Sequence, residues 1–290
     1  TLALYRSLNV GHDRIIWDVG HQAYVHKLLS GRLHDFSSLR LAGGMSGFPR
    51  RDESPYDVFG TGHGSTSLSA ALGFAQSDRL NGNDAWTVAV VGDGAYTGGM
   101  IHEALNNCDS RLHLLVILNE NEMSISRNTG RFAAMFSKLR NSGYYRRKAG
   151  FKRFLSHVPL IGAPLSSFFS KWKKNLKNKI YNSNYFENMG LFYLGPVDGN
   201  DYGAVAALIG EAKRLGTSCI IHVKTQKGRG FAPAEQNPGS FHSVAAVGQV
   251  AASPEERYSS VMGNALTELA KENRSVCAVT AAITDGTGLS

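Results

Sequence analysis

The chain has 290 residues, 42% hydrophobic and 19% charged, which suits one large globular domain or one domain and part of a second. No apolar run reaches the roughly 20 residues that cross a bilayer, and no signal peptide is visible, so we expect no membrane partner. Three widely spaced cysteines, Cys108, Cys219 and Cys277, argue against a disulfide framework and a CxxC metal site. A reducing, cytoplasmic location is therefore expected.

The formal net charge of +8 is concentrated in one stretch. Residues 138–179 contain twelve Lys or Arg and no Asp or Glu, so the rest of the chain is net negative. Because this stretch lacks a recognisable nucleic-acid motif, no nucleic-acid partner is expected. We interpret residues 132–184 as a basic, variable insertion of short helices and mobile connections.

The hydrophobic pattern predicts strands that alternate with helices. The predicted strands are 14–18, 86–91, 112–118, 191–194, 218–223 and 276–280. The predicted helices are 65–80, 99–107, 202–215 and 255–272. Such alternation indicates an α/β fold with a parallel sheet flanked by helices on both faces.

Two domains are predicted from this order of elements. Residues 1–250 form the first, and residues 255–290 begin a second, similar domain that is left incomplete. Between them, residues 227–254 are rich in Gly and Pro without periodicity, which suits a linker or a loop that lines a site.

The strongest local signal is Gly92-Asp93-Gly94, followed one βα unit later by Asn119-Glu120-Asn121. Each group follows an apolar strand, at the edge where open α/β sheets place ligands. The glycines let a backbone approach closely, and the helix start after Gly94 presents N–H groups to an anion. Asp93 and Asn121 supply the hard oxygen ligands that suit Mg²⁺ or Ca²⁺. Asp-Gly is also a common turn, but its pairing with the Asn cluster favours a metal site.

Two further segments carry candidate residues. The loop Gly62-His63-Gly64-Ser65-Thr66-Ser67 enters a helix, so it contacts a diphosphate or the adjoining ring, or it caps the helix through Ser65 or Thr66; both remain open. His21 follows the first strand, where it is an acid/base group, a hydrogen-bond donor to an anion, or a structural residue. The same alternatives hold for His242.

Gly92-Asp93-Gly94 with Asn121 resembles the diphosphate-binding motif of thiamine-diphosphate enzymes, and the spacing of 28 residues from Asp93 to Asn121 fits that motif. Four longer strings resemble the 1-deoxy-D-xylulose-5-phosphate synthase family in particular. They are WDVGHQAYVHK (17–27), GGMSGFPRRDESPYDVFGTGHGSTS (43–67), NENEMSIS (119–126) and KGRGFAPAE (227–235). The resemblance covers nearly the whole chain and is weakest at about 132–184.

This resemblance implies a homodimeric transferase of thiamine-diphosphate-binding fold that uses thiamine diphosphate and Mg²⁺. It implies decarboxylation of pyruvate and condensation with D-glyceraldehyde 3-phosphate, giving CO₂ and 1-deoxy-D-xylulose 5-phosphate, a precursor of isoprenoids, thiamine and pyridoxal. The alternatives are another enzyme of the transketolase superfamily and a non-catalytic cofactor-binding fragment.

The resemblance also implies roles for residues at matching positions. Asp93 and Asn121 would bind the metal, with the main-chain carbonyl of Met123. The implied cofactor contacts are His21, Gly62, His63, Gly64, Gly94, Ala95, Asn121, Ile125 (an apolar wedge) and Phe231. The candidate catalytic residues are His21, His63 and His242. The sequence departs from the family at Gly64, which is usually Ser, and at Phe231, which is commonly Tyr.

We further expect the chain to be cut short at both ends. By the resemblance, the glutamate that activates the aminopyrimidine lies beyond Ser290, and a further histidine precedes Thr1. The chain by itself is therefore expected to be inactive.

Overall fold

A computed structural model of the chain describes residues 1–121, 184–239, 241–242, 246, 257–280 and 287–289. Within this part, five parallel strands form one sheet in the order β1-β2-β3-β5-β4. The strands are β1 (Arg14–Trp17), β2 (Thr87–Gly92), β3 (Leu114–Glu120), β4 (Phe192–Asp198) and β5 (Cys219–Lys224). They coincide with the first five predicted strands to within a few residues, so the predicted parallel sheet is confirmed.

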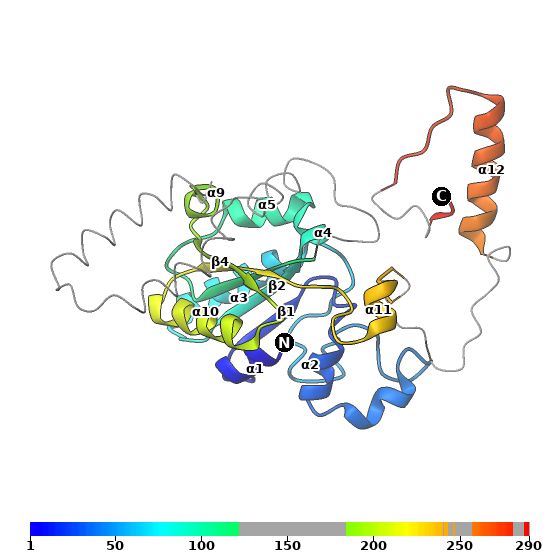
Figure 1. Cartoon of the computed structure of the whole chain (residues 1–290). Coiled ribbons are helices and arrows are strands. Elements are labelled where there is room, and N and C mark those ends of the chain that lie inside the picture. Colours follow the sequence, from blue (N-terminus) through cyan, green and yellow to red (C-terminus); the bar gives the residue numbers. More distant parts are fainter. Residues whose placement is uncertain (122–183, 240, 243–245, 247–256, 281–286, 290) are drawn as a thin grey trace, which may run out of the picture.

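Helices cover both faces of this sheet (Figure 1). One face is covered by α3 (Ser67–Asn81), α5 (Gly99–Asn106) and α9 (Asn184–Asn188), and the other by α1 (Leu2–Ser7) and α10 (Tyr202–Leu215). The connections from β1 to β2 and β3 step across the sheet in one direction, whereas the connection from β4 to β5 steps back. Right-handed crossovers place the helices of opposite steps on opposite faces, which explains the position of α10.

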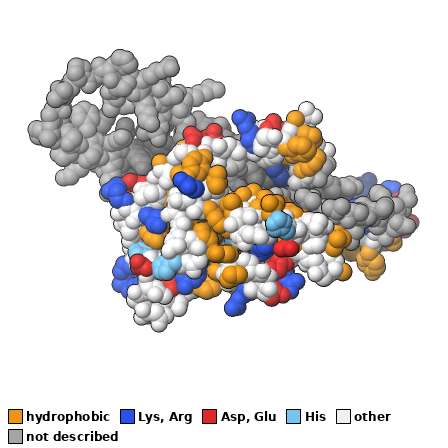
Figure 2. All heavy atoms as spheres, turned by 90° about the horizontal axis from the view of Figure 1, so that it is seen from below, with side chains coloured by type: hydrophobic (Ala, Val, Ile, Leu, Met, Phe, Trp, Pro, Cys, Tyr) orange, Lys and Arg blue, Asp and Glu red, His pale blue; other side chains and the backbone are white. Residues whose placement is uncertain are grey.

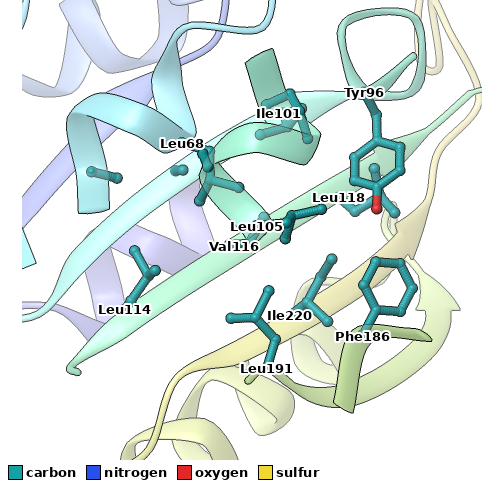
Figure 3. Packing of buried hydrophobic residues seen from close by; sticks show 14 of the residues in the cluster. Leu68, Tyr96, Ile101, Leu105, Leu114, Val116, Leu118, Phe186, Leu191 and Ile220 are labelled. Atoms are coloured by element: carbon teal, nitrogen blue, oxygen red, sulfur yellow. The ribbon is translucent and has the colours of Figure 1, made fainter. Parts of the chain in front are cut away.

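The hydrophobic core lies on the two faces of the central strands. Leu114, Val116 and Leu118 of β3 face α3, α5 and α9, while Leu115 and Ile117 face the side of α1 and α10. Figure 3 shows the packing of the cluster on the face covered by α3, α5 and α9. Burying one large aliphatic side chain contributes about 1.5–3 kcal/mol, so this packing holds firm the strands from which the site loops extend.

Between β1 and α3 the chain leaves the sheet and forms a lobe with α2 (Tyr24–Leu29) and the 3₁₀ helix η1 (Leu33–Ser38). This lobe contains a buried ion network. Its members are His26, Lys27, Arg32, Glu53 and Asp57. Asp57 is 3% exposed, with Nε2 of His26 at 2.8 Å from Oδ1 and the Arg32 guanidinium at 2.7 and 2.8 Å. Lys27 is fully buried, and its Nζ lies 2.5 Å from Oε2 of Glu53.

The C-terminal part agrees only in part with the prediction. The predicted helix 255–272 is α12 (Tyr258–Glu272), which Figure 1 draws apart from the sheet. The predicted strand 276–280 is wrong, because no strand forms there and Val279 is 95% exposed. A strand needs a neighbouring strand to satisfy its backbone groups, and no described residues pair with this segment. The apolar pattern alone did not reveal this.

Three other expectations concern loops, domains and membranes. Residues 227–254 contain a short helix, α11 (Ala232–Gln236), with Pro233 in its first turn, which is too short to produce a hydrophobic period. The insertion 132–184 falls outside the described residues except at its end, and the division at about residue 250 stays a prediction. Among the described helices, none combines the length and hydrophobicity needed to cross a membrane.

Candidate active site

A cleft of about 1050 Å³ opens at the carboxyl ends of β1, β2, β3 and β5. This is the edge at which parallel α/β sheets bind ligands, because loops from several strands converge there. The side chains and backbone that line it include Asp18, His21, Gln22, Gly64, Ser65, Asp93, Gly94, Ala95, Asn119, Asn121, Thr225, Lys227, Phe241 and His242. The first part of the loop after β5, up to His242, thus lines the cleft, in agreement with one of its two predicted interpretations.

Asp93 and Asn121 meet at this edge, as their positions after neighbouring strands predicted. Asp93 begins the short helix α4 (Asp93–Tyr96), and its side chain is almost fully buried. Its Oδ1 accepts a hydrogen bond from the backbone N–H of Gly94 at 2.9 Å, and Oδ2 accepts one from the backbone N–H of Asn121 at 3.3 Å. The carboxylate therefore links the ends of β2 and β3. The metal-binding role of the two residues stays a prediction.

The donor set at this edge fits Mg²⁺. One carboxylate and one amide supply hard oxygen atoms, and no group of three or more His, Cys, Asp or Glu side chains in the described part of the chain could hold a metal. A cation at Asp93 would therefore need further oxygen atoms from phosphate groups, water or the main chain. Gly94 and Ala95 line the cleft beside Asp93.

The start of α3 is capped by an acidic residue that sequence reasoning missed. Capping of this helix by the hydroxyl group of Ser65 or Thr66 was one of the two interpretations of this loop, but its N-cap, Thr66, makes no side-chain capping hydrogen bond. Instead Asp18, just after β1, accepts hydrogen bonds from the N–H of Ser65 at 2.7 Å and of Ser67 at 3.0 Å. It also accepts one from the Ser67 hydroxyl at 2.6 Å. The capping hypothesis is therefore wrong about the side chain that accepts the hydrogen bonds, which is Asp18 rather than Ser65 or Thr66.

A strained turn follows Asp18 and leads to His21. Val19 has φ 58°, an outlier for a β-branched residue, and Gly20 has φ 83°. A Cβ atom at Gly20 would lie 2.1 Å from Oγ1 of Thr61, so only glycine fits. Strain of this kind persists where the surrounding structure enforces it, commonly at binding sites.

Nitrogen-bearing side chains crowd one side of the cleft. The rings of His21 and His242 stack with centroids 4.5 Å apart, and Nζ of Lys227 lies 2.8 Å from Nδ1 of His242. Gln22 donates a hydrogen bond to the main-chain oxygen of His242 at 2.6 Å. The structure thus brings two predicted histidines together. Lys227 was missed as a site residue, although the string that begins with it pointed to this loop.

The pKa values of these three side chains are lowered. Burial, followed by the nearby His242 and Lys227, lowers the pKa of His21 to about 4. Burial and Lys227 also lower the pKa of His242. The pKa of Lys227 is lowered by burial, an effect that Asp93 opposes. Near neutral pH His21 is therefore uncharged, and its pKa disfavours proton uptake there.

Some predicted residues lie elsewhere. Gly62 and His63 are exposed and do not line the cleft, whereas Gly64 does. A Cβ atom at Gly64 would make only an ordinary 3.7 Å contact with Val19, so the serine that is usual in the family would fit.

Phe231 is 55% exposed and also lies outside the cleft lining. Its ring packs edge-on against Phe241 at 5.6 Å, and Phe241 lines the cleft. Met123 and Ile125 lie outside the described residues, so their predicted roles stay predictions.

Comparison with known proteins gives a consistent result. Residues 1–225 match the family described as 1-deoxy-D-xylulose-5-phosphate synthase. The 1-deoxy-D-xylulose-5-phosphate synthases of Clostridium kluyveri and Desulfitobacterium hafniense are 44% and 46% identical over 100% of this chain. The chain covers 47% of each of them, so it spans about half the length of the curated relatives it matches.

Two solved structures also align with the chain. A transketolase from Leishmania mexicana has a TM-score of 0.47 at 19% identity, over 74% of this chain and 28% of its own. A transketolase from Pichia stipitis has a TM-score of 0.49 at 17% identity, over 77% of this chain and 30% of its own. From the family match over most of its length and the relatives above 40% identity, the chain belongs to the 1-deoxy-D-xylulose-5-phosphate synthase family.

Proposed function

We propose that this chain forms the diphosphate- and metal-binding part of a 1-deoxy-D-xylulose-5-phosphate synthase. The complete enzyme decarboxylates pyruvate and joins the remaining two-carbon fragment to D-glyceraldehyde 3-phosphate, giving 1-deoxy-D-xylulose 5-phosphate and CO₂. The observation that carries the proposal is the meeting of Asp93 and Asn121 at adjacent strand ends, inside the cleft of a chain of this family.

The proposed cofactors are thiamine diphosphate and Mg²⁺. Asp93 and Asn121 would hold the metal through their side-chain oxygen atoms, with the main-chain carbonyl of Met123. Gly94 and Ala95 would contact the diphosphate through the backbone, which they present to the cleft beside Asp93. When bound, thiamine diphosphate supplies the carbanion chemistry, and the protein supplies binding, orientation and electrostatics.

The nitrogen-bearing side chains have a distinct proposed role. Because the pKa of His21 is about 4, its ring is neutral near pH 7 and suits hydrogen bonding to bound groups better than proton abstraction. His242, in contact with Lys227, would help to hold an anionic group of a substrate.

Six further residues keep proposed roles that come from the resemblance. His63 is proposed as a catalytic residue and a cofactor contact although it is exposed. The remaining proposed cofactor contacts are Gly62, Gly64, Ile125 and Phe231, and Met123 remains a proposed metal ligand.

We also propose a homodimer in the cytoplasm. Figure 2 shows hydrophobic side chains gathered on the face seen from below, the side on which Figure 1 draws α1 and α2. These two helices expose the apolar residues Leu2, Val25, Leu28 and Leu29. Contiguous apolar surface of this kind is typical of protein interfaces, and a second copy is the partner that the family resemblance implies.

The replacement Asp93→Ala in the complete enzyme tests the metal site. We expect it to abolish Mg²⁺-dependent binding of thiamine diphosphate in isothermal titration calorimetry, because the only carboxylate proposed for the metal is lost. The matched control is Asp13→Asn, at the opposite edge of the sheet, where Asp13 accepts hydrogen bonds from the N–H groups of Trp86 and Asn9, both at 2.8 Å.

The control is expected to bind the cofactor as the parent enzyme does. Wild-type affinity in Asp93→Ala would refute the metal assignment. Failure of the parent enzyme to bind thiamine diphosphate with Mg²⁺ would refute the proposed function itself.

A further inference from the structure

Asp18 connects two loops of the cleft that come from distant parts of the sequence. Both of its carboxylate oxygen atoms accept hydrogen bonds from the segment that opens α3, from Ser65 to Oδ1 and from Ser67 to Oδ2. The same carboxylate directly precedes the strained turn at Val19 that leads to His21. Its position therefore fixes the end of β1 and the start of α3 relative to each other.

Ser65 extends this connection to a third loop. Its hydroxyl donates a hydrogen bond of 2.6 Å to the main-chain oxygen of Ala95, in the turn after β2. A Cβ atom at Gly98 would lie 2.0 Å from Oγ of Ser65, so the two segments are in close contact. Ser65 itself has φ 69°, a conformation that a serine rarely adopts without fixed partners. The path from Asp18 through Ser65 to Ala95 thus joins the loops after β1, before α3 and after β2.

The same hydrogen bonds place a carboxylate of the protein at the start of α3. A helix N-terminus attracts negative charge through its free N–H groups and its dipole. Here the Asp18 carboxylate already accepts from the N–H groups of Ser65 and Ser67.

We propose that Asp18 is a positioning residue for the cofactor cleft, and that it acts through Ser65 on the turn at Gly94 and Ala95. The inference rests on the proposed function of the cleft. It assigns Gly64 and Ser65 a place in the wall of the cleft, beside a helix start whose first N–H group, that of Ser67, is bonded to the protein's own carboxylate.

Three replacements test the inference in the complete enzyme: Asp18→Ala, Asp18→Asn and Ser65→Ala. Asp18→Asn keeps the shape but sets an amide N–H₂ against one of the two backbone N–H groups. We expect each variant to bind thiamine diphosphate with Mg²⁺ about tenfold more weakly, since one to two hydrogen bonds that order the loops are lost. The measurement is calorimetry at a temperature well below the melting temperature of the variant.

Asp13→Asn is the control for a purely structural effect, because Asp13 is also buried and also accepts two backbone N–H bonds, at the far edge of the sheet. A structural role for Asp18 predicts a lower melting temperature with unchanged cofactor affinity, as in the control. A positioning role predicts weaker affinity in both conservative variants, Asp18→Asn and Ser65→Ala. It also predicts that their combination weakens binding by less than the product of the single effects.

The inference is overturned if Asp18→Asn and Ser65→Ala bind the cofactor as tightly as Asp13→Asn does. If Asp18→Ala does not fold, these two variants still decide the question. If the proposed function itself is wrong, the outcome is distinguishable, because the parent enzyme would then show no Mg²⁺-dependent binding of thiamine diphosphate.

Discussion

The cleft and the buried ion network differ in how their ionisable side chains are arranged. In the network, every buried charge has an opposite partner. Burial alone would raise the pKa of Asp57, but hydrogen bonds from His26, Arg32 and the main chain outweigh burial and lower it. In the cleft, His21, His242 and Lys227 lie against one another, and the pKa values of all three are lowered.

The difference separates a structural region from a functional one. Paired charges leave little free energy to be gained from a ligand, and removing one partner exposes the other to an unfavourable environment. Burial, and for the two histidines also the neighbouring cationic groups, raises the free energy of the charged forms, and an anion that enters the cleft relieves this cost. Stability should therefore depend on the network, and affinity for anions on the cleft.

The largest expected effect is on stability and comes from the network. Asp57→Ala leaves the side chains of Arg32 and His26 buried without their shared carboxylate, and it should cost about 3–5 kcal/mol in the free energy of unfolding. Chemical denaturation followed by circular dichroism measures this. Asp52, an exposed carboxylate paired with Arg50, is the control, and Asp52→Ala should leave the denaturation midpoint unchanged. Equal losses in the two variants would show that the network has no special structural role.

The network also shows where sequence reasoning stops. Lys27 and Glu53 are 26 residues apart, in a segment without hydrophobic periodicity, so nothing in their spacing predicted an ion pair. The cap of α3 was missed for a similar reason, since Asp18 acts on residues 47 and 49 positions away. Reading a sequence along helices and strands gives no information on such pairs.

The sheet and the centre of the cleft were predictable because they depend on local patterns. Continuous apolar runs predicted β2 and β3, and the rule that ligands bind at the carboxyl ends of parallel strands then brought Asp93 and Asn121 together. The strand expected at 276–280 failed because pairing depends on a neighbour, not on the segment itself. The hydrophobic pattern thus predicted most strands and helices, and the structure adds the contacts between residues that lie far apart in the sequence.

A pair of lysine replacements tests the difference between the network and the cleft, with expected changes in stability of intermediate size. Lys27→Met removes a buried partner of Glu53 and should cost about 1–3 kcal/mol in the free energy of unfolding. Lys227→Met removes a charge from among like neighbours, so the free energy of unfolding should change by less than about 1 kcal/mol. Both are measured by denaturation at pH 7. A loss in Lys227→Met as large as in Lys27→Met would contradict the distinction between the two regions.

The last expected effect is the pH dependence that His21 contributes. Its pKa is about 4 in the folded chain, against the ordinary value of 6.5, so the folded state binds the proton less readily than the unfolded state. The contribution of the neutral ring to stability is therefore complete above about pH 6.5. It is lost progressively as the pH falls from 6.5 to 4, and it does not change further below 4.

Nuclear magnetic resonance titration of the histidine ring protons measures this pKa directly, with His21→Gln to assign the signal. Because Lys227 is one of the groups that lower it, Lys227→Met should raise the midpoint of His21 toward 6.5 while burial still holds it below that value. The stability of the parent protein should also fall more steeply than that of His21→Gln between pH 6.5 and 4. A midpoint of 6.5 for His21 in the parent protein would mean that its ring is solvated. The crowding that distinguishes the cleft from the ion network would then not reach this residue.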